Sequence, residues 1–178
     1  MQDDLKDFYE MVEELEVAMF TTRRPDGRLV SRPMATQARA DGADLWFVTS
    51  RDTDKLEEIA FDPQVNLAYY KDGSTEWISV SGTAKTSTDR EKIRELHRPD
   101  WEIYFPDEGG EKDGGPDDPR LVLVGVDIES ARFMEVNKPK AVVLFELATA
   151  EVTGGTPDIA KIRDVDSAEV EEGRRSRA

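Results

Sequence analysis

Strand-like runs joined by tight turns constrain this chain more than any other feature. From about residue 19 to residue 87, alternating apolar and polar residues are interrupted by the turn sequences RPDG, ARADGAD and KDGS. Turns of this kind join antiparallel neighbours, whereas a parallel sheet needs a helix after most strands. The pattern therefore predicts a mainly β fold of about six or seven strands, arranged as an antiparallel barrel with peripheral helices.

Short helices are expected at three places beside these strands. Residues 4–18 carry apolar side chains at spacings of three and four, which is typical of an amphipathic helix. Asp54, followed three residues later by Glu57, fits the N-cap and capping box of a helix that runs through Phe61. Asp89 can cap a third helix, which ends at about His97.

The domain organisation predicted from length and periodicity is simple. At 178 residues the chain is long enough for one domain, which we assign to residues 1–150. The runs at 121–128 and 141–147 are apolar on both faces and are predicted to be buried strands, while Pro106–Pro119 is predicted to be a surface loop. Residues 151–178 form a C-terminal extension, and we expect its last dozen residues to be disordered.

Charge and composition exclude several classes of function. The net charge of −15 argues against binding to nucleic acid or to anionic membranes, both of which need concentrated positive charge. The apolar runs are too short to cross a bilayer, and the first residues do not resemble a secretory signal. There is no cysteine, hence no disulfide and no thiolate nucleophile. We expect a cytoplasmic protein without nucleic-acid or membrane partners.

Common catalytic and metal-binding patterns are missing from the sequence. The single histidine, His97, lies at the end of a predicted helix, where a structural role is favoured over catalysis. One histidine and scattered carboxylates do not make a zinc site, and the acidic loop DEGGEKDGG does not have the spacing of an EF-hand. No phosphate loop or dinucleotide fingerprint is present.

The stretch WFVTSRDTDK, residues 46–55, gathers hydroxyls and a cation where a strand passes into a helix. Thr49 and Ser50 end an apolar strand, and Lys55 follows in the first helical turn. Hydroxyls, free helix-start amides and an ammonium together form a suitable pocket for a phosphate group. The alternative is that the polar residues are ordinary caps and that Lys55 covers surface.

A second candidate site residue is Arg32, which lies between Val30 and Met34 on one face of a predicted strand. Burying an arginine charge alone is costly, so this residue needs an anionic partner. A bound anionic cofactor and an internal carboxylate both satisfy that requirement, and the sequence leaves the two alternatives open.

Several segments, in order, resemble the pyridoxamine phosphate oxidase-like, FMN-binding split-barrel proteins, and in particular their general stress protein branch. The segments are GRLVSRPM, DLWFVTSRDTDKLEEI, PQVNLAYY, WISVSGTA and the run from YFP to ARFME, so the resemblance covers about residues 10–147. It implies a six-stranded antiparallel split β-barrel that forms a homodimer with FMN at the interface. Deazaflavin, FAD and haem are alternative occupants. The residues implied to contact the cofactor are Arg32, Pro33, Met34, Phe47, Val48, Thr49, Ser50, Lys55 and Trp77.

Two departures from the family pattern bear on function. Where members of the branch carry a Trp-Asp pair, this chain has Phe133-Met134-Glu135, and Trp101 or Tyr104 is the candidate to replace the missing tryptophan. No histidine follows His97, so the substrate motif of the true pyridoxamine phosphate oxidases is absent. The resemblance implies a stress-related, FMN-dependent oxidoreductase with a small-molecule redox partner. A flavin-storage or sensing protein without turnover, or a domain that has lost its flavin, are the alternatives.

Overall fold

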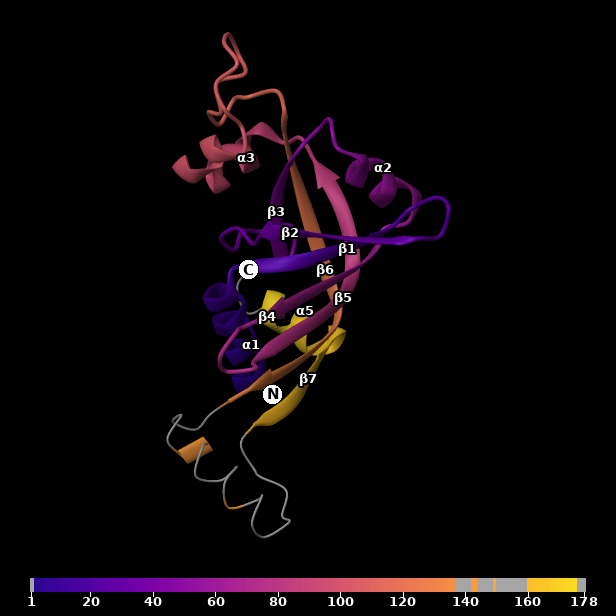
Figure 1. Ribbon diagram of the computed structural model, residues 1–178, viewed down its shortest axis with the longest axis vertical. Helices are drawn as coiled ribbons and strands as arrows, with labels where there is room; N and C mark the ends of the chain where they lie inside the picture. Colours follow the sequence, from indigo (N-terminus) through magenta and orange to yellow (C-terminus); the bar gives the residue numbers. More distant parts are fainter. Residues whose placement is uncertain (1, 137–141, 144–148, 150–159, 176–178) are drawn as a thin grey trace.

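The computed structural model describes residues 2–136, 142–143, 149 and 160–175, and its centre is one antiparallel sheet (Figure 1). The strands are β1 (Val17–Arg23), β2 (Leu29–Ala35), β3 (Leu45–Ser50), β4 (Gln64–Tyr70), β5 (Trp77–Ser87), β6 (Leu121–Glu135) and β7 (Lys161–Asp166). The helices are α1 (Gln2–Leu15), α2 (Asp54–Phe61), α3 (Arg90–Leu96), the 3-10 helix η1 (Pro99–Ile103) and α5 (Ser167–Arg175).

The sheet closes on itself. Hydrogen-bonded neighbours follow the order β2-β1-β4-β5-β6-β3, and an isolated bridge between Thr36 and Phe47 joins β3 back to the end of β2. The backbone N–H of Gln37 reinforces this closure by donating to the Trp46 carbonyl at 2.8 Å. Every strand pair is antiparallel, and β7 adds to the far half of β6. The predicted antiparallel barrel with peripheral helices is confirmed.

Two apolar clusters lie on opposite sides of the barrel wall. The larger one fills the barrel and extends under α1 and α5, where Phe8, Val12 and Val170 are buried. The smaller one lies outside β3 and β6, beneath α3 and η1, and contains Trp46 and Trp101. Burial of these side chains attaches the 90–105 segment to the barrel, and this attachment gives the site described below one of its walls.

The helix boundaries differ slightly from those predicted. Helix α1 ends at Leu15 rather than at residue 18, because Glu16 adopts a left-handed backbone conformation (φ 54°) and the chain then enters β1. Helix α2 ends at Phe61 as expected, but Asp54 is its first residue and not its cap. The cap position belongs to Thr53, whose hydroxyl donates to the Ser50 carbonyl and caps no helix amide.

The C-terminal end corrects a prediction. Disorder was expected over the last dozen residues, yet Ser167–Arg175 form α5. Val165 and Val170 of this segment are buried, and the Arg174 guanidinium donates to the buried Asp44 carboxylate, so both apolar burial and an ion pair hold α5 against the barrel. The predicted domain boundary at residue 150 lies outside the described residues. So does most of the predicted 141–147 strand, of which the two described residues, Val142 and Val143, are helical.

No helix in the described part of the chain is both long enough and apolar enough to cross a membrane.

Candidate functional site

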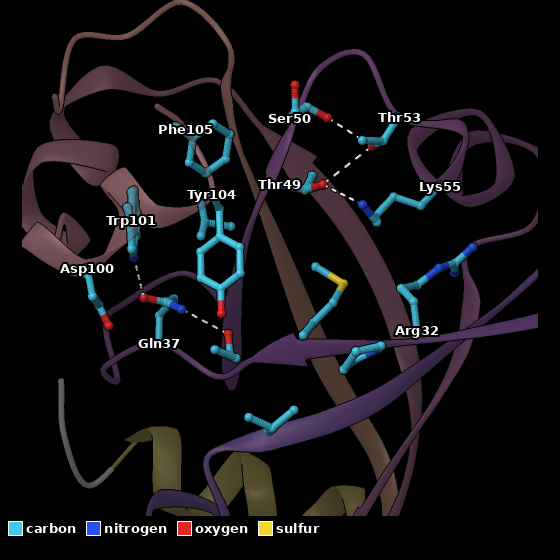
Figure 2. A pocket seen from close by; sticks show the side chains of 15 residues that line it. Arg32, Gln37, Thr49, Ser50, Thr53, Lys55, Asp100, Trp101, Tyr104 and Phe105 are labelled. Carbon is cyan, nitrogen blue, oxygen red and sulfur yellow. Dashed lines mark hydrogen bonds between the residues drawn. The ribbon is translucent and has the colours of Figure 1, made fainter. Parts of the chain in front are cut away.

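A cavity of about 330 Å³ opens between β2, the end of β3, the start of α2 and η1 (Figure 2). Residues far apart in the sequence meet there because β2 and β3 close the barrel side by side. The predicted site residues that line it are Arg32, Pro33, Met34, Val48, Thr49, Ser50 and Lys55. The structure thus brings together most of the set that the sequence singled out.

One end of the cavity is polar and is built from the β3–α2 junction. The Lys55 ammonium donates to the Thr49 hydroxyl at 2.6 Å, and the Thr53 hydroxyl lies 3.3 Å from that of Thr49 (Figure 2). Ser50 contributes a further hydroxyl to the lining. The hydroxyls of Thr49 and Thr53 and the Lys55 ammonium therefore lie close together at the amino end of α2, where helix amides lack intrahelical partners, whereas the Ser50 hydroxyl accepts from the Asp52 amide.

The positive charge of Lys55 is not matched by a protein carboxylate. Among the described residues, none places a carboxylate oxygen within 4.0 Å of the Lys55 ammonium, which donates to the neutral Thr49 hydroxyl. Burial, followed by the nearby charge of Arg32, lowers the pKa of Lys55 from its usual value, and the more distant charges of Glu58 and Asp54 offset this only in part. Since helix α2 also begins without a side-chain cap, this end of the cavity is suited to hold an anion.

Arg32, by contrast, already has a carboxylate partner. Its guanidinium lies 2.7 Å from Glu58 Oε2 on α2 and also donates to the Thr22 hydroxyl on β1. The Thr22 hydroxyl donates in turn to the same Glu58 oxygen at 2.5 Å. Burial alone would raise the pKa of Glu58, but the hydrogen bonds from Thr22 and Arg32 lower it. Of the two partners that the sequence left open, the structure contains the internal carboxylate.

An aromatic wall faces the polar end. Trp101 is buried, and its indole N–H donates to the Gln37 side-chain oxygen at 2.9 Å. The Gln37 amide nitrogen donates to the Ala35 carbonyl, which ties η1 to the end of β2. Tyr104 is 72% exposed and, with Phe105, completes this side of the lining, across the cavity from Lys55 (Figure 2). Trp101 and Tyr104 are the two aromatic residues that the sequence put forward as replacements for the family tryptophan.

Two predicted contact residues do not line the cavity. Phe47 points into the barrel, fully buried, with its ring 5.2 Å from that of Phe20. Its neighbours Val48 and Thr49, nearer the end of β3, line the cavity instead. Trp77 begins β5 opposite Tyr70 and Met134, away from the cavity. A cofactor contact by either residue stays a prediction.

The replaced family pair also lies elsewhere. Phe133 is buried in the barrel core 6.1 Å from the Phe8 ring, and Met134 pairs with Ile162 of β7. Glu135 forms an ion pair with Arg163 at 2.5 Å. In this chain the three residues attach α1 and β7 to the barrel, and none of them lines the cavity.

Some lining residues were missed by sequence reasoning. Gln37, Phe105 and Val17 carried no signal, since a lone glutamine in a loop or a valine at a strand start is common. Thr53 was part of the hydroxyl-rich stretch but was not assigned to the site. Only the closure of β3 against β2 and the packing of η1 reveal these contributions.

The histidine lies at the end of α3 as predicted, but its ring contacts the Gly114 carbonyl of a distant loop and not the last carbonyls of the helix. His97 caps α3, its Nε2 lies 3.2 Å from the Gly114 carbonyl oxygen, and its ring packs edge-on against Trp101. No group of three or more histidine or acidic side chains with metal-site geometry occurs among the described residues.

Comparison with known proteins places the cavity in a family context. The family model described as "Pyridoxamine 5'-phosphate oxidase like" matches residues 3–158. Protein bli-3 of Neurospora crassa is 31% identical over 179 residues, which cover 99% of this chain and 86% of that protein.

Solved structures agree with this match. A crystal structure described as a general stress protein 26 from Jannaschia sp. CCS1 is 29% identical, with a TM-score of 0.73 over 93% of this chain and 99% of the other. The general stress FMN/FAD binding protein from Xanthomonas citri is 25% identical, with a TM-score of 0.60 over 76% of this chain and 89% of the other.

Proposed function

Because the chain belongs to the pyridoxamine 5'-phosphate oxidase-like family, in its general stress protein 26 branch, we propose that it binds FMN in this cavity and acts as an FMN-dependent oxidoreductase. The similar Xanthomonas citri protein is described as FMN/FAD binding, which supports a flavin as the occupant. Deazaflavin and haem are the alternative occupants that the resemblance in sequence implies. We further propose that the protein works in the cytoplasm.

The observation that carries the proposal is the unmatched cation at the β3–α2 junction. Thr49 lies within bonding distance of both Lys55 and Thr53, so one charge and two hydroxyls gather at an uncapped helix start. A terminal phosphate supplies the missing negative charge and several acceptor oxygens, and charge-assisted hydrogen bonds of this kind are the strong ones. The donor set therefore fits the phosphate of FMN.

The remainder of the cavity fits an aromatic ring system. Pro33, Met34 and Val48 form an apolar floor on β2 and β3, while Trp101 and Tyr104 form the opposite wall. These side chains would bind and orient the ring and exclude water from one of its faces. A bound flavin supplies the hydride and electron transfer, and the protein supplies position and electrostatics.

We propose a homodimer as the functional form. The outward faces of β2, β1, β4 and β5 are exposed or partly buried and, over the middle of these strands, uncharged: Val17, Met19, Thr21, Ser31, Pro33, Ala35, Asn66, Ala68, Tyr70, Trp77, Ser79 and Ser81. Two copies of a chain with net charge −15 repel one another least across such a face. Val17 and Pro33 also line the cavity, so a second copy seated here would border the cofactor.

One observation favours a second candidate function, flavin storage or sensing without turnover. The ionisable side chains that line the cavity are Arg32, Lys55, Asp100 and Tyr104. Arg32 is committed to Glu58, Asp100 is paired with Arg98 at 3.0 Å, and His97 lies in the loop contact described above. Apart from Lys55, which is assigned above to the phosphate, and the exposed Tyr104 hydroxyl, this lining offers no general acid or base for substrate chemistry.

The proposed function is tested in two steps. The visible spectrum of the purified protein, before and after addition of FMN, and quenching of FMN fluorescence on titration measure binding. A colourless protein that does not quench FMN fluorescence would contradict the proposal. Steady-state assays with reduced nicotinamide then separate oxidoreductase from storage protein, because sustained turnover excludes the second candidate. Sedimentation analysis measures the dimer.

A further inference from the structure

Glu58 is a buried carboxylate next to the cavity that the proposed flavin chemistry does not use directly. Its side chain is 6% exposed, and it does not line the cavity. It lies three positions after Lys55, so the two side chains project from the same side of α2. Helix α2 thus brings a cation to the cavity and, one turn later, an anion to Arg32.

Three elements meet at this carboxylate. Oε2 of Glu58 accepts from Thr22 on β1 at 2.5 Å and from Arg32 on β2 at 2.7 Å. Figure 2 shows the Arg32 side chain running from β2 toward α2. Because the ion pair is largely withdrawn from water, the position of the guanidinium is fixed by Glu58 and Thr22 rather than by solvent.

The pairing has an electrostatic consequence for the cavity. A lone guanidinium at the position of Arg32 would add a second full positive charge beside that of Lys55, whose pKa the Arg32 charge already lowers. Glu58 cancels most of that charge at short range. A flavin gains negative charge when it is reduced, so the net charge near its ring sets the balance between the oxidised and reduced forms.

We propose that Glu58 is a positioning residue that holds Arg32 in place and compensates its charge, and so keeps the bound flavin harder to reduce than an uncompensated arginine would. The inference rests on the proposed FMN site. It concerns a residue that neither the sequence pattern nor the cavity lining singles out.

The test compares Glu58→Gln with wild-type protein, both loaded with FMN. Glutamine keeps the shape and one acceptor oxygen but removes the charge. At a fixed poise of a redox dye, the ratio of reduced to oxidised flavin should rise by about tenfold, which is about 30 mV for a two-electron couple. A ratio unchanged within about twofold, or lowered, in folded Glu58→Gln would overturn the inference.

Two further variants keep the test decisive. Arg32→Gln leaves Glu58 as an uncompensated anion, and the ratio should fall by about tenfold. In the double variant Arg32→Gln with Glu58→Gln, both charges are gone and the ratio should return to within about twofold of wild type. If Glu58→Gln does not fold, the double variant is compared with Arg32→Gln, since the two differ only in the Glu58 charge, and equal ratios in the two would overturn the inference.

The matched control is Glu57→Gln. It removes the same charge from the adjacent, exposed position of α2, and the ratio should stay within about twofold of wild type. A rise equal to that of Glu58→Gln would mean that general charge, and not the Arg32 contact, sets the balance. If wild-type protein does not bind FMN at all, the proposed function fails. If it binds FMN but Glu58→Gln leaves the ratio unchanged, only the present inference fails.

Discussion

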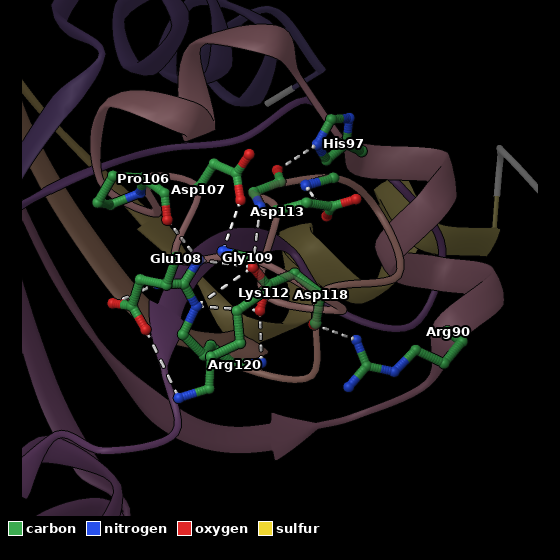
Figure 3. A network of polar contacts seen from close by, with 12 residues as sticks. Arg90, His97, Pro106, Asp107, Glu108, Gly109, Lys112, Asp113, Asp118 and Arg120 are labelled. Atoms are coloured by element: carbon green, nitrogen blue, oxygen red, sulfur yellow. Dashed lines mark hydrogen bonds and ion pairs between the residues drawn. The ribbon is translucent and has the colours of Figure 1, made fainter.

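Lys55 and Arg120 are both withdrawn from solvent to some degree, but the protein treats their charges in opposite ways. Arg120, 8% exposed, lies 2.7 Å from Asp118 and 2.9 Å from Glu108, and it donates to the Pro106 carbonyl at 2.9 Å (Figure 3). Lys55, at the cavity, is partly buried and donates to a neutral hydroxyl. One cation is saturated by the protein itself, and the other leaves bonding capacity for a ligand.

The difference separates a structural site from a candidate binding site. With 39 acidic residues against 24 lysines and arginines, the chain has an excess of carboxylates from which partners could have been drawn. The 106–120 loop uses them: burial alone would raise the pKa of Asp118, but the hydrogen bonds from Arg120 and from the Gly114 amide lower it to about 2. At the cavity, Arg32 is paired with Glu58, but Lys55 has no carboxylate oxygen within 4.0 Å among the described residues, and this difference supports the proposed anionic ligand.

The largest effect, a loss of unfolding free energy, is expected from removing Arg120, the cation whose charge the protein itself neutralises. Arg120→Ala leaves the fully buried Asp118 carboxylate without its cation, and loss of one partner of a buried pair costs about 3–5 kcal/mol of unfolding free energy. Urea denaturation measures this loss. FMN affinity of the folded fraction should remain unchanged, because the loop does not line the cavity. A loss below about 1 kcal/mol would show that the loop is not anchored by this pair.

The second prediction concerns Lys55, the cation without a carboxylate partner. Thr49→Ala combined with Lys55→Ala should weaken FMN binding by at least about tenfold, since charged hydrogen bonds contribute about 1.5–3 kcal/mol each. Fluorescence titration measures the affinity. Riboflavin, which has the same ring but no phosphate, is the matched ligand, and its affinity should change by less than about twofold. Equal losses of affinity for FMN and for riboflavin would contradict the assignment of the phosphate to this end of the cavity.

The sequence predicted the short segments that contribute to the site better than the long-range contacts that bring them together. The β3–α2 junction and the Arg32 strand were found because their chemistry lies within short segments. Phe47 was assigned to the site by its position in a run, although its ring packs against Phe20 in the barrel core. Gln37 and Glu58 were not found, because their roles depend on contacts with Trp101 and Arg32, 64 and 26 residues away in the sequence.

The fold shows the same limit. The antiparallel barrel followed from turn chemistry, which acts within a few residues. The helical structure of α5 could not be predicted in this way, because its sequence is highly charged. The helix is held by burial of Val170 and by the bond between Arg174 and Asp44, 130 positions earlier. The 106–119 loop was expected on the surface by composition, yet Asp118 within it is fully buried. Long-range partners decide these cases.

A smaller effect is expected from pH, and it tests whether the open cation acts through its charge. Because burial lowers the pKa of Lys55, its ammonium should lose its proton at a pH below the ordinary lysine value of about 10.4. FMN affinity should therefore hold near neutral pH and fall as the pH rises toward that value. Lys55→Arg, which keeps its charge at high pH, should fall less steeply in the same titration. Identical pH profiles would mean that the Lys55 charge does not contribute to binding.

The smallest effect is expected from an exposed copy of the saturated pair. Arg94 and Asp117 lie 2.6 Å apart beside the same loop, but their side chains are 54% and 67% exposed. Water solvates both charges in the absence of the pair, so Arg94→Ala should cost no more than about 1 kcal/mol of unfolding free energy in the denaturation experiment used for Arg120→Ala. If the two arginine variants lost equal stability, burial would not explain why Arg120 anchors the loop. Arg120 and Lys55 would then differ only in whether a carboxylate partner is present. Exposed ion pairs of this acidic chain would have to stabilise the fold as much as buried ones do.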